Sequence, residues 1–186
     1  MRRTALGLIS LGILVAGVGV ALRFEGSRGQ SIAEGRWRVQ EAIPGLQHLP
    51  ESVTRISFPS QGDVYFVTDG ASNQSLLLGP ARLTWSAAPG QTGNCIILAH
   101  RDTHFRVLRD VRKNDRVVLE RGGQRFEYKI VSMKVVSAND DRFFRPTNDP
   151  VLTLVTCYPF SYLGRAPKRY IVRAELLAQE GSRRQA

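Results

Sequence analysis

From about Pro50 onward, apolar and polar residues alternate in short runs, which is the pattern of β-strands with one buried and one exposed face. The run Asn94–Ala99 is apolar almost throughout, and this composition predicts a central strand. The turn Arg121-Gly122-Gly123-Gln124 predicts a hairpin between the strands that flank it. The other expected strands are residues 53–58, 63–67, 115–120, 125–136, 151–156 and 169–177.

Prolines and glycines separate these runs, and only short helices fit between them, near residues 71–77 and 103–111. The chain contains no internal repeat and no low-complexity tract. About eight short strands with few helices predict an all-β domain, either an antiparallel barrel or a sandwich.

The N-terminus has a different pattern. Arg2 and Arg3 precede 19 residues without a charge, Thr4–Leu22. As a helix this stretch is about 28 Å long, close to the hydrocarbon thickness of a bilayer. We expect a single membrane-spanning helix whose basic N-terminus stays in the cytoplasm. The alternative is a cleaved signal peptide with Gly19-Val20-Ala21 as its cleavage site.

Composition divides the chain into four parts. Residues 1–22 are the expected anchor or signal peptide. Residues 23–49 mix Gly, Ser, Glu and Arg, which predicts a stalk with at most a short helix. Residues 50–178 are the folded domain, long enough to bury a core of its own, and residues 179–186 are a disordered tail. The anchor places the domain outside the cytoplasm, in the periplasm or at the cell surface.

The chain is strongly basic, with Lys+Arg 26 against Asp+Glu 16 and a net charge of +10. The basic residues are spread singly along the chain, whereas a nucleic-acid-binding protein usually gathers them in a patch interleaved with aromatic residues. Aromatic residues make up only 8% of this chain. We therefore expect no nucleic-acid partner.

Three residues with catalytic potential stand at the ends of predicted strands: His100, Cys157 and Arg169. A thiol is nucleophilic as the thiolate and needs a partner that manages its proton, which a histidine can do near neutral pH. Acyl transfer also needs a positive or hydrogen-bonding group for the developing oxyanion, and arginine keeps its charge at any working pH. Strand ends can meet at one rim of a barrel, so these three residues form a candidate catalytic set.

The sequence around these residues resembles the sortases, a family of cysteine transpeptidases that attach surface proteins to cell envelopes or to one another. The resemblance is carried by GNCIILAHRDTHF at 93–105, LTLVTCYPF at 152–160 and APKRYIV at 166–172, with TRISFP at 54–59 and LGP at 78–80. The family motif TLxTC corresponds to Thr153–Cys157. The sequences TCYPF and HRDTHF are most similar to those of the class D sortases and their relatives in Gram-negative bacteria.

The resemblance implies a closed eight-stranded sortase β-barrel over about residues 50–178. It implies Cys157 as nucleophile, His100 as general acid and base, Arg169 as the group that holds the substrate backbone and the oxyanion, and Thr156 as a residue that lines the substrate site. The substrate would be a protein with an LPxTG-like C-terminal sorting signal. The acceptor would be an amine of a cell-wall precursor or of another protein, and no cofactor would be needed.

Other interpretations of these residues remain open at this stage. Hydrolysis by a plain cysteine peptidase, or a non-catalytic envelope-binding barrel, would preserve the same motifs. Cys95 lies in an apolar strand, which favours a packing role, although an oxidising compartment would permit a Cys95–Cys157 disulfide. His100 and His104 are four residues apart, but a strand end does not give the spacing of a metal site, and we expect no metal. Arg173 is the rival of Arg169.

Overall fold

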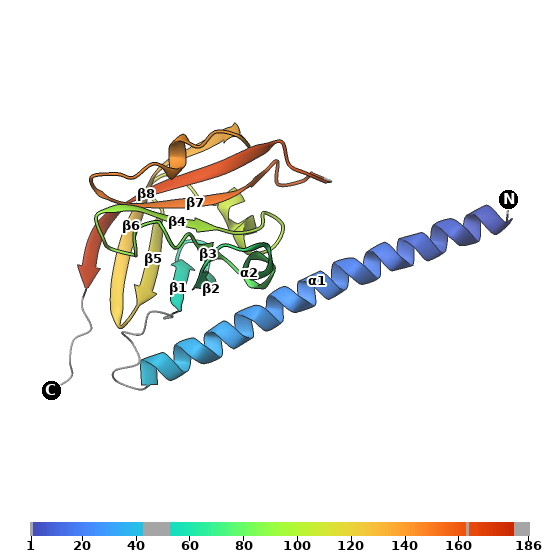
Figure 1. The fold of residues 1–186 in the computed structure, drawn as a ribbon, viewed down its shortest axis with the longest axis horizontal. Coiled ribbons are helices and arrows are strands. Elements are labelled where there is room, and N and C mark those ends of the chain that lie inside the picture. Colours follow the sequence, from blue (N-terminus) through green and yellow to red (C-terminus); the bar gives the residue numbers. More distant parts are fainter. Residues whose placement is uncertain (1, 43–52, 163, 181–186) are drawn as a thin grey trace.

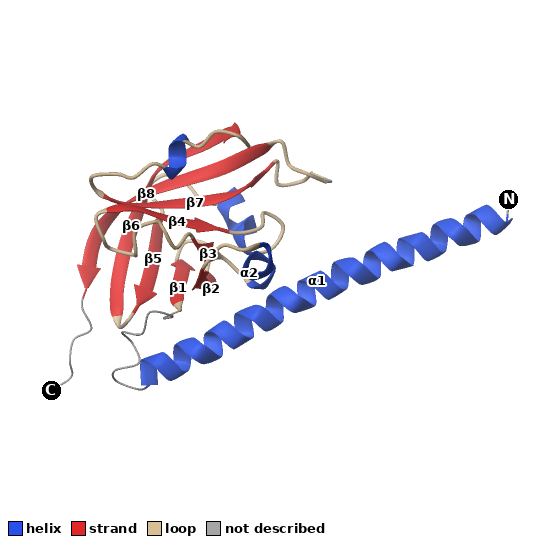
Figure 2. Ribbon diagram, viewed as in Figure 1, coloured by secondary structure: helices blue, strands red, loops and turns tan. Residues whose placement is uncertain are grey.

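The computed structural model describes residues 2–42, 53–162 and 164–180, without the side chains of residues 2–17, 19, 22–24 and 178–180. Within these ranges eight strands form a closed barrel in the order β1-β2-β3-β4-β7-β8-β6-β5 (Figures 1 and 2). The strands are β1 (Thr54–Phe58), β2 (Asp63–Asp69), β3 (Ala81–Arg82), β4 (Gly93–Leu98), β5 (Arg116–Arg121), β6 (Gln124–Ser137), β7 (Pro150–Tyr158) and β8 (Lys168–Glu180).

The predicted barrel is confirmed, with two differences. The strand β3 was not predicted, because two residues after Pro80 are too short to show a periodic pattern. The barrel is also not wholly antiparallel: β4 pairs with β7, and β2 with β3, in parallel. The expectation that residues 94–99 form a central strand is confirmed, since β4 lies between β3 and β7 and Asn94–Ile97 are buried.

The core is the inside of the barrel. Its largest fully buried side chains include Phe58, Phe105, Leu119 and Tyr128, and burial of a side chain of this size stabilises the fold by about 1.5–3 kcal/mol. The hydroxyl of Tyr128 accepts a hydrogen bond of 2.7 Å from the backbone nitrogen of Gly90, so this buried polar atom is satisfied.

The short predicted helices are present. The helix α2 (Asn73–Leu78) begins with a capping box, in which Ser72 and Ser75 bond each other's backbone nitrogens. The helices η2 (His104–Arg109) and η3 (Arg142–Phe144) are 3-10 helices. The strand β8 continues to Glu180, so residues 179 and 180 are not part of a disordered tail, and residues 181–186 lie outside the described residues.

Residues 23–42 of the expected stalk are helical, since α1 runs without interruption over Arg2–Ala42 (Figure 1), and residues 43–49 lie outside the described residues. The helix α1 packs along the barrel beside β2 and α2. Nothing in the described part of the chain forms a helix both long enough and apolar enough to cross a membrane. The predicted span, residues 4–22, falls almost entirely on positions whose side chains are not described.

Candidate active site

Parallel pairing of β4 with β7 brings two of the predicted site residues to one end of the barrel. The register pairs Cys95 with Leu152 and Leu98 with Val155, so both strands run out at the same pole. His100 follows β4 by two residues, and Cys157 is the last but one residue of β7. Residues that are 57 positions apart in the sequence thus become neighbours.

Thr156 ties these two strand ends together. Its hydroxyl donates a 2.8 Å hydrogen bond to the carbonyl of Ala99, and the backbone nitrogen of Ala99 donates to the carbonyl of Val155 at 3.2 Å. The Thr156 side chain is 2% exposed and turns inward, away from the solvent side of Cys157. The structure therefore gives Thr156 a positioning contact, between the residues that precede His100 and Cys157, and the expected contact of Thr156 with substrate stays a prediction.

Arg169 reaches the thiol from the neighbouring strand. It is the direct cross-strand partner of Cys157 in the antiparallel β7–β8 pair. Its Nη1 atom lies 3.7 Å from Cys157 Sγ and also donates to the carbonyl of Lys168 at 3.2 Å. Arg173, the rival, pairs with Thr153 and lines a separate groove with Lys134 and Asp140. The geometry therefore favours Arg169 as the arginine beside the thiol.

His100, Cys157 and Arg169 line one pocket of about 230 Å³, which we call the Cys157 pocket. Its lining comes from the ends of β4 and β7, from the β7–β8 loop and from the start of β8: His100, Arg101, Asp102, Cys157, Gly164, Arg165, Ala166 and Arg169.

Arg101 is a site residue that the sequence did not single out. Its Nη2 atom donates to the carbonyls of Tyr162 at 2.6 Å and Gly164 at 3.1 Å, and its guanidinium lies over the Tyr162 ring at 5.8 Å. These contacts hold the β7–β8 loop over the pocket. No local pattern could have revealed them, because the partners lie about 60 residues further along the chain and are mostly backbone atoms.

The second histidine belongs to a different cavity. His104 is buried, with its Nδ1 atom 3.2 Å from the hydroxyl of Thr103 and its ring edge-on to Tyr65 at 5.7 Å. Burial lowers its pKa, and the nearby His100 lowers that pKa further. The N-cap residue of η2 is Thr103, which makes no side-chain capping bond.

The two cysteines have opposite environments. Cys95 is 1% exposed in the core, and burial raises the pKa of its thiol to about 12. Cys157 is partly exposed at the pocket, and both thiols are free. Across the part of the chain that the structure describes, no three His, Cys, Asp or Glu side chains lie close enough together to hold a metal ion.

A model of the sortase domain matches residues 56–177, about two thirds of the chain and the whole barrel except the first two residues of β1 and the last three of β8. The chain belongs to the sortase family. It is 36% identical over 107 residues to sortase D of Bacillus subtilis strain 168, a match that covers 57% of this chain and 54% of that protein. The chain thus spans about half the length of the curated relative that it matches.

Solved sortase structures share the fold. The catalytic domain of Bacillus anthracis sortase D superposes with a TM-score of 0.61 and 30% identity, over 73% of this chain and 93% of that domain. A Clostridium perfringens sortase D transpeptidase gives a TM-score of 0.66 at 20% identity, over 83% and 99% of the two chains. Listeria monocytogenes sortase A gives 0.63 at 24% identity, over 70% and 90%. These last two likenesses concern the fold alone.

Proposed function

We propose that this sortase is a membrane-anchored cysteine transpeptidase that cleaves an LPxTG-like C-terminal sorting signal and transfers the protein to an amine of the cell envelope. The observation that carries the proposal is the Cys157 pocket, in which a partly exposed thiol shares one cavity with His100 and with Arg169, the latter 3.7 Å from the sulfur. A nucleophile, a proton carrier and a permanent positive charge are the parts that acyl transfer requires.

In the first half of the reaction, the Cys157 thiolate attacks the carbonyl carbon of the scissile peptide bond. The tetrahedral oxyanion is stabilised by the Arg169 guanidinium, which also holds the peptide backbone. His100 protonates the leaving amine, the carbon–nitrogen bond breaks, and a thioester between Cys157 and the new C-terminus of the substrate remains.

In the second half, the acceptor amine attacks the thioester carbonyl and passes its proton to His100. The carbon–sulfur bond breaks and Cys157 leaves as the thiolate, so the enzyme returns to its starting state with one peptide bond broken and one formed. Thr156 supports both halves, since its bond to Ala99 keeps the ends of β7 and β4 in register.

The proposal includes the location of the enzyme. Residues 4–22 form the single membrane span and residues 50–178 the catalytic domain on the extracytoplasmic side. The uncharged composition of residues 4–22 and the two arginines before them support this arrangement.

The test uses an internally quenched peptide with an LPxTG-type sequence, with and without triglycine as the acceptor amine. We expect triglycine to yield the ligated peptide, and mass spectrometry to detect an acyl adduct on Cys157. Cys157→Ala should remove both products and His100→Ala the greater part of them. Peptide cleavage that persists in a folded Cys157→Ala protein would refute the mechanism.

Two alternatives give different results in the same assay. A cysteine peptidase would form the acyl adduct but release only the hydrolysed acid, whatever the triglycine concentration. A non-catalytic binding barrel would form no adduct at all, and alkylation of Cys157 would proceed equally in the parent protein and in His100→Ala.

A further inference from the structure

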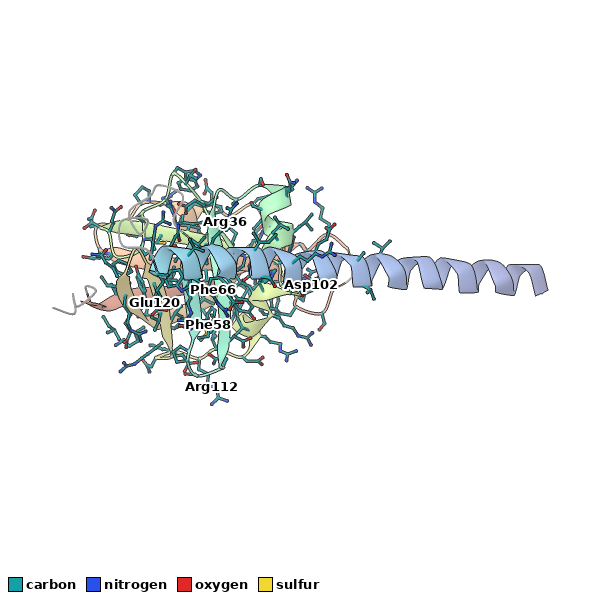
Figure 3. All side chains as sticks on the ribbon, turned by 90° about the horizontal axis from the view of Figure 1, so that it is seen from below. Arg36, Phe58, Phe66, Asp102, Arg112 and Glu120 are labelled. Atoms are coloured by element: carbon teal, nitrogen blue, oxygen red, sulfur yellow. The ribbon has the colours of Figure 1, made fainter. Side chains whose placement is uncertain are left out.

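The barrel lies alongside α1. The two open ends of the barrel, which we call its poles, lie beside different segments of the helix. At one level, a cavity of about 580 Å³ is bounded by Gly26, Ser27 and Gln30 on α1 and by Asp102, Thr103 and His104, among others, on the barrel. At the other level, a cavity of about 240 Å³ is bounded by Trp37, Gln40 and Glu41 and by the β5–β6 turn at Gly122–Arg125. Figure 3 shows this order, with Asp102 toward the N-terminal part of α1 and Glu120 toward its other end.

The Cys157 pocket is at the first of these poles. Asp102 lines both this pocket and the cavity beside Gly26, so the two hollows are adjacent. The β7–β8 loop, which forms the outer wall of the pocket, extends from the barrel toward the same side as the N-terminal half of α1 (Figure 1). The candidate active site therefore faces along α1 toward the N-terminus of the chain.

Specific contacts fix this orientation. The side-chain amide of Gln30 bonds both backbone groups of Phe66 on β2, accepting from its nitrogen at 2.7 Å and donating to its carbonyl at 3.0 Å. Trp37 packs on the ring of Phe66 at 6.4 Å, and Gln40 accepts a bond of 3.2 Å from the nitrogen of Val53.

The absence of a side chain at Gly29 permits the close approach of α1. A Cβ atom added there would come within 2.7 Å of the Cα atom of Leu78 on α2. Because α1 is continuous and held at several points, the barrel cannot turn freely about it.

The distance to the proposed membrane span is short. Among the α1 residues whose side chains are described, Gly26 already lies against the barrel, since an added Cβ there would be 3.5 Å from His104 Cε1. Leu22, the last residue of the uncharged stretch, precedes Gly26 by four positions, which is about 6 Å along a helix. The other pole, beside Trp37–Glu41, is 11 to 15 residues beyond Gly26, which is about 17–22 Å further along the axis.

The surface around the Cys157 pocket is basic. Residues 100–106 and 158–169, which form this end of the barrel, contain five basic side chains and one carboxylate: Arg101, Arg106, Arg165, Lys168, Arg169 and Asp102. Arg106, Arg165 and Lys168 are exposed, and among the described residues none of these three forms an ion pair. Tyr162 is 46% exposed beside them. Basic residues with an exposed tyrosine are typical of surfaces that meet lipid headgroups.

We propose that this end of the barrel, the basic rim formed by Arg106, Tyr162, Arg165 and Lys168, docks on the anionic headgroups of the membrane that holds α1. The Cys157 pocket then opens at the membrane surface. The inference rests on the anchor in the proposed function, but not on the proposed chemistry.

The test measures how near each pole lies to the lipid. Ser161 in the β7–β8 loop and Gln124 in the β5–β6 turn are both exposed, so Ser161→Cys and Gln124→Cys in a Cys157→Ala background each accept one fluorophore, because Cys95 is buried. The full chain is reconstituted in vesicles of phosphatidylcholine alone or with about one third phosphatidylglycerol, and quenching by headgroup-labelled lipid is recorded. We expect strong quenching at position 161 with anionic lipid, less with neutral lipid, and little at position 124.

A charge-matched pair of variants tests the rim. Arg165→Glu with Lys168→Glu should remove most of the extra quenching that anionic lipid produces at position 161, since each basic residue near the surface strengthens binding about fivefold. Arg112→Glu with Lys113→Glu changes the net charge equally at an exposed site away from the rim and should leave the quenching unchanged.

Three outcomes would overturn the proposal. Equal quenching at positions 161 and 124 would mean that the barrel has no fixed orientation. Quenching at position 161 that is equally strong with neutral and with anionic lipid would mean that the basic rim does not recognise the headgroup charge. Release of the chain from the vesicles by alkaline carbonate would show that residues 4–22 do not span the membrane. The peptide assay of the proposed function does not depend on this result.

Discussion

The middle and the end of the β4–β7 pair carry the two cysteines of this sortase, and the two positions have opposite properties. Cys95 is in the middle of β4, enclosed by the core, with a thiol whose pKa burial raises to about 12. Cys157 is near the end of β7, partly exposed and beside a guanidinium. Cys95 is the third of the six residues of β4, and Cys157 is the eighth of the nine residues of β7. Depth along the strand separates a packing cysteine from a candidate nucleophile.

The same contrast holds for the threonines of β7. Thr153 donates a buried hydrogen bond of 2.6 Å to Asn94 Oδ1 in the middle of the pair, and Thr156 donates one of 2.8 Å to the Ala99 carbonyl at its end. The first bond joins two strands on the outer face of the barrel, where Asn94 also donates to the carbonyl of Phe143. The second bond also positions the strand ends that carry His100 and Cys157. We therefore expect two hydrogen bonds of similar length to differ in their effect on activity.

The largest expected difference is in thiol reactivity. Iodoacetamide at pH 8 should modify one thiol per native chain, at Cys157, and a second only after unfolding. With a pKa of about 12, Cys95 is ionised to only about one part in 10⁴ at this pH, and its burial excludes the reagent. Mass spectrometry of the digested protein measures this. Modification of both thiols at similar rates would remove the distinction between the two positions.

The next largest effect should separate the two arginines of β8. Arg169→Ala should lower kcat/KM for the peptide about 10²–10³-fold, as loss of one oxyanion-stabilising group does elsewhere. Arg173→Ala, four residues along the same strand, should change it by no more than about twofold. A larger loss in Arg173→Ala than in Arg169→Ala would show that the wrong arginine is assigned to the pocket.

A smaller effect is expected on stability, and here substitution of Cys95 should matter more than substitution of Cys157. Cys95→Ser places a hydroxyl in the apolar core and should lower the free energy of unfolding by about 1–3 kcal/mol. Cys157→Ser, at the partly exposed end, should change it by less than about 0.5 kcal/mol. Urea denaturation of the full chain in detergent gives both values. Equal values for the two variants would contradict the burial described for Cys95.

The smallest effect concerns the two threonines. Thr156→Val and Thr153→Val should each lower stability by about 1 kcal/mol through the lost hydrogen bond. Only Thr156→Val should also lower kcat, by several-fold with KM unchanged, because His100 and Cys157 lose a shared support. A Thr156→Ser variant restores the hydroxyl and should restore kcat. Equal loss of kcat in the two valine variants would make the Thr156 contact merely structural.

Sequence periodicity predicted most strands to within one or two residues, because a barrel strand needs alternate buried positions and Gly or Pro at its ends. The residue types at the predicted strand ends, together with the family resemblance, gave His100, Cys157 and Arg169 as a candidate catalytic set. The sequence could not predict β3, which is two residues long, or Arg101, whose contacts are with distant backbone carbonyls. It also could not predict the hydrogen bond of the Thr156 hydroxyl to the Ala99 carbonyl, which joins the ends of two strands far apart in the chain.

The sequence alone determined that this protein has an all-β domain after an uncharged stretch, with a nucleophile motif at a strand end, since these properties are local to each segment. The tertiary structure decided which strands lie parallel, and so that His100 and Cys157 meet at one pole with Arg169 opposite. It also decided that residues 23–42 form a helix fixed to the barrel, where composition suggested a stalk. Pairing and docking depend on contacts between residues far apart in the chain, and no local pattern records them.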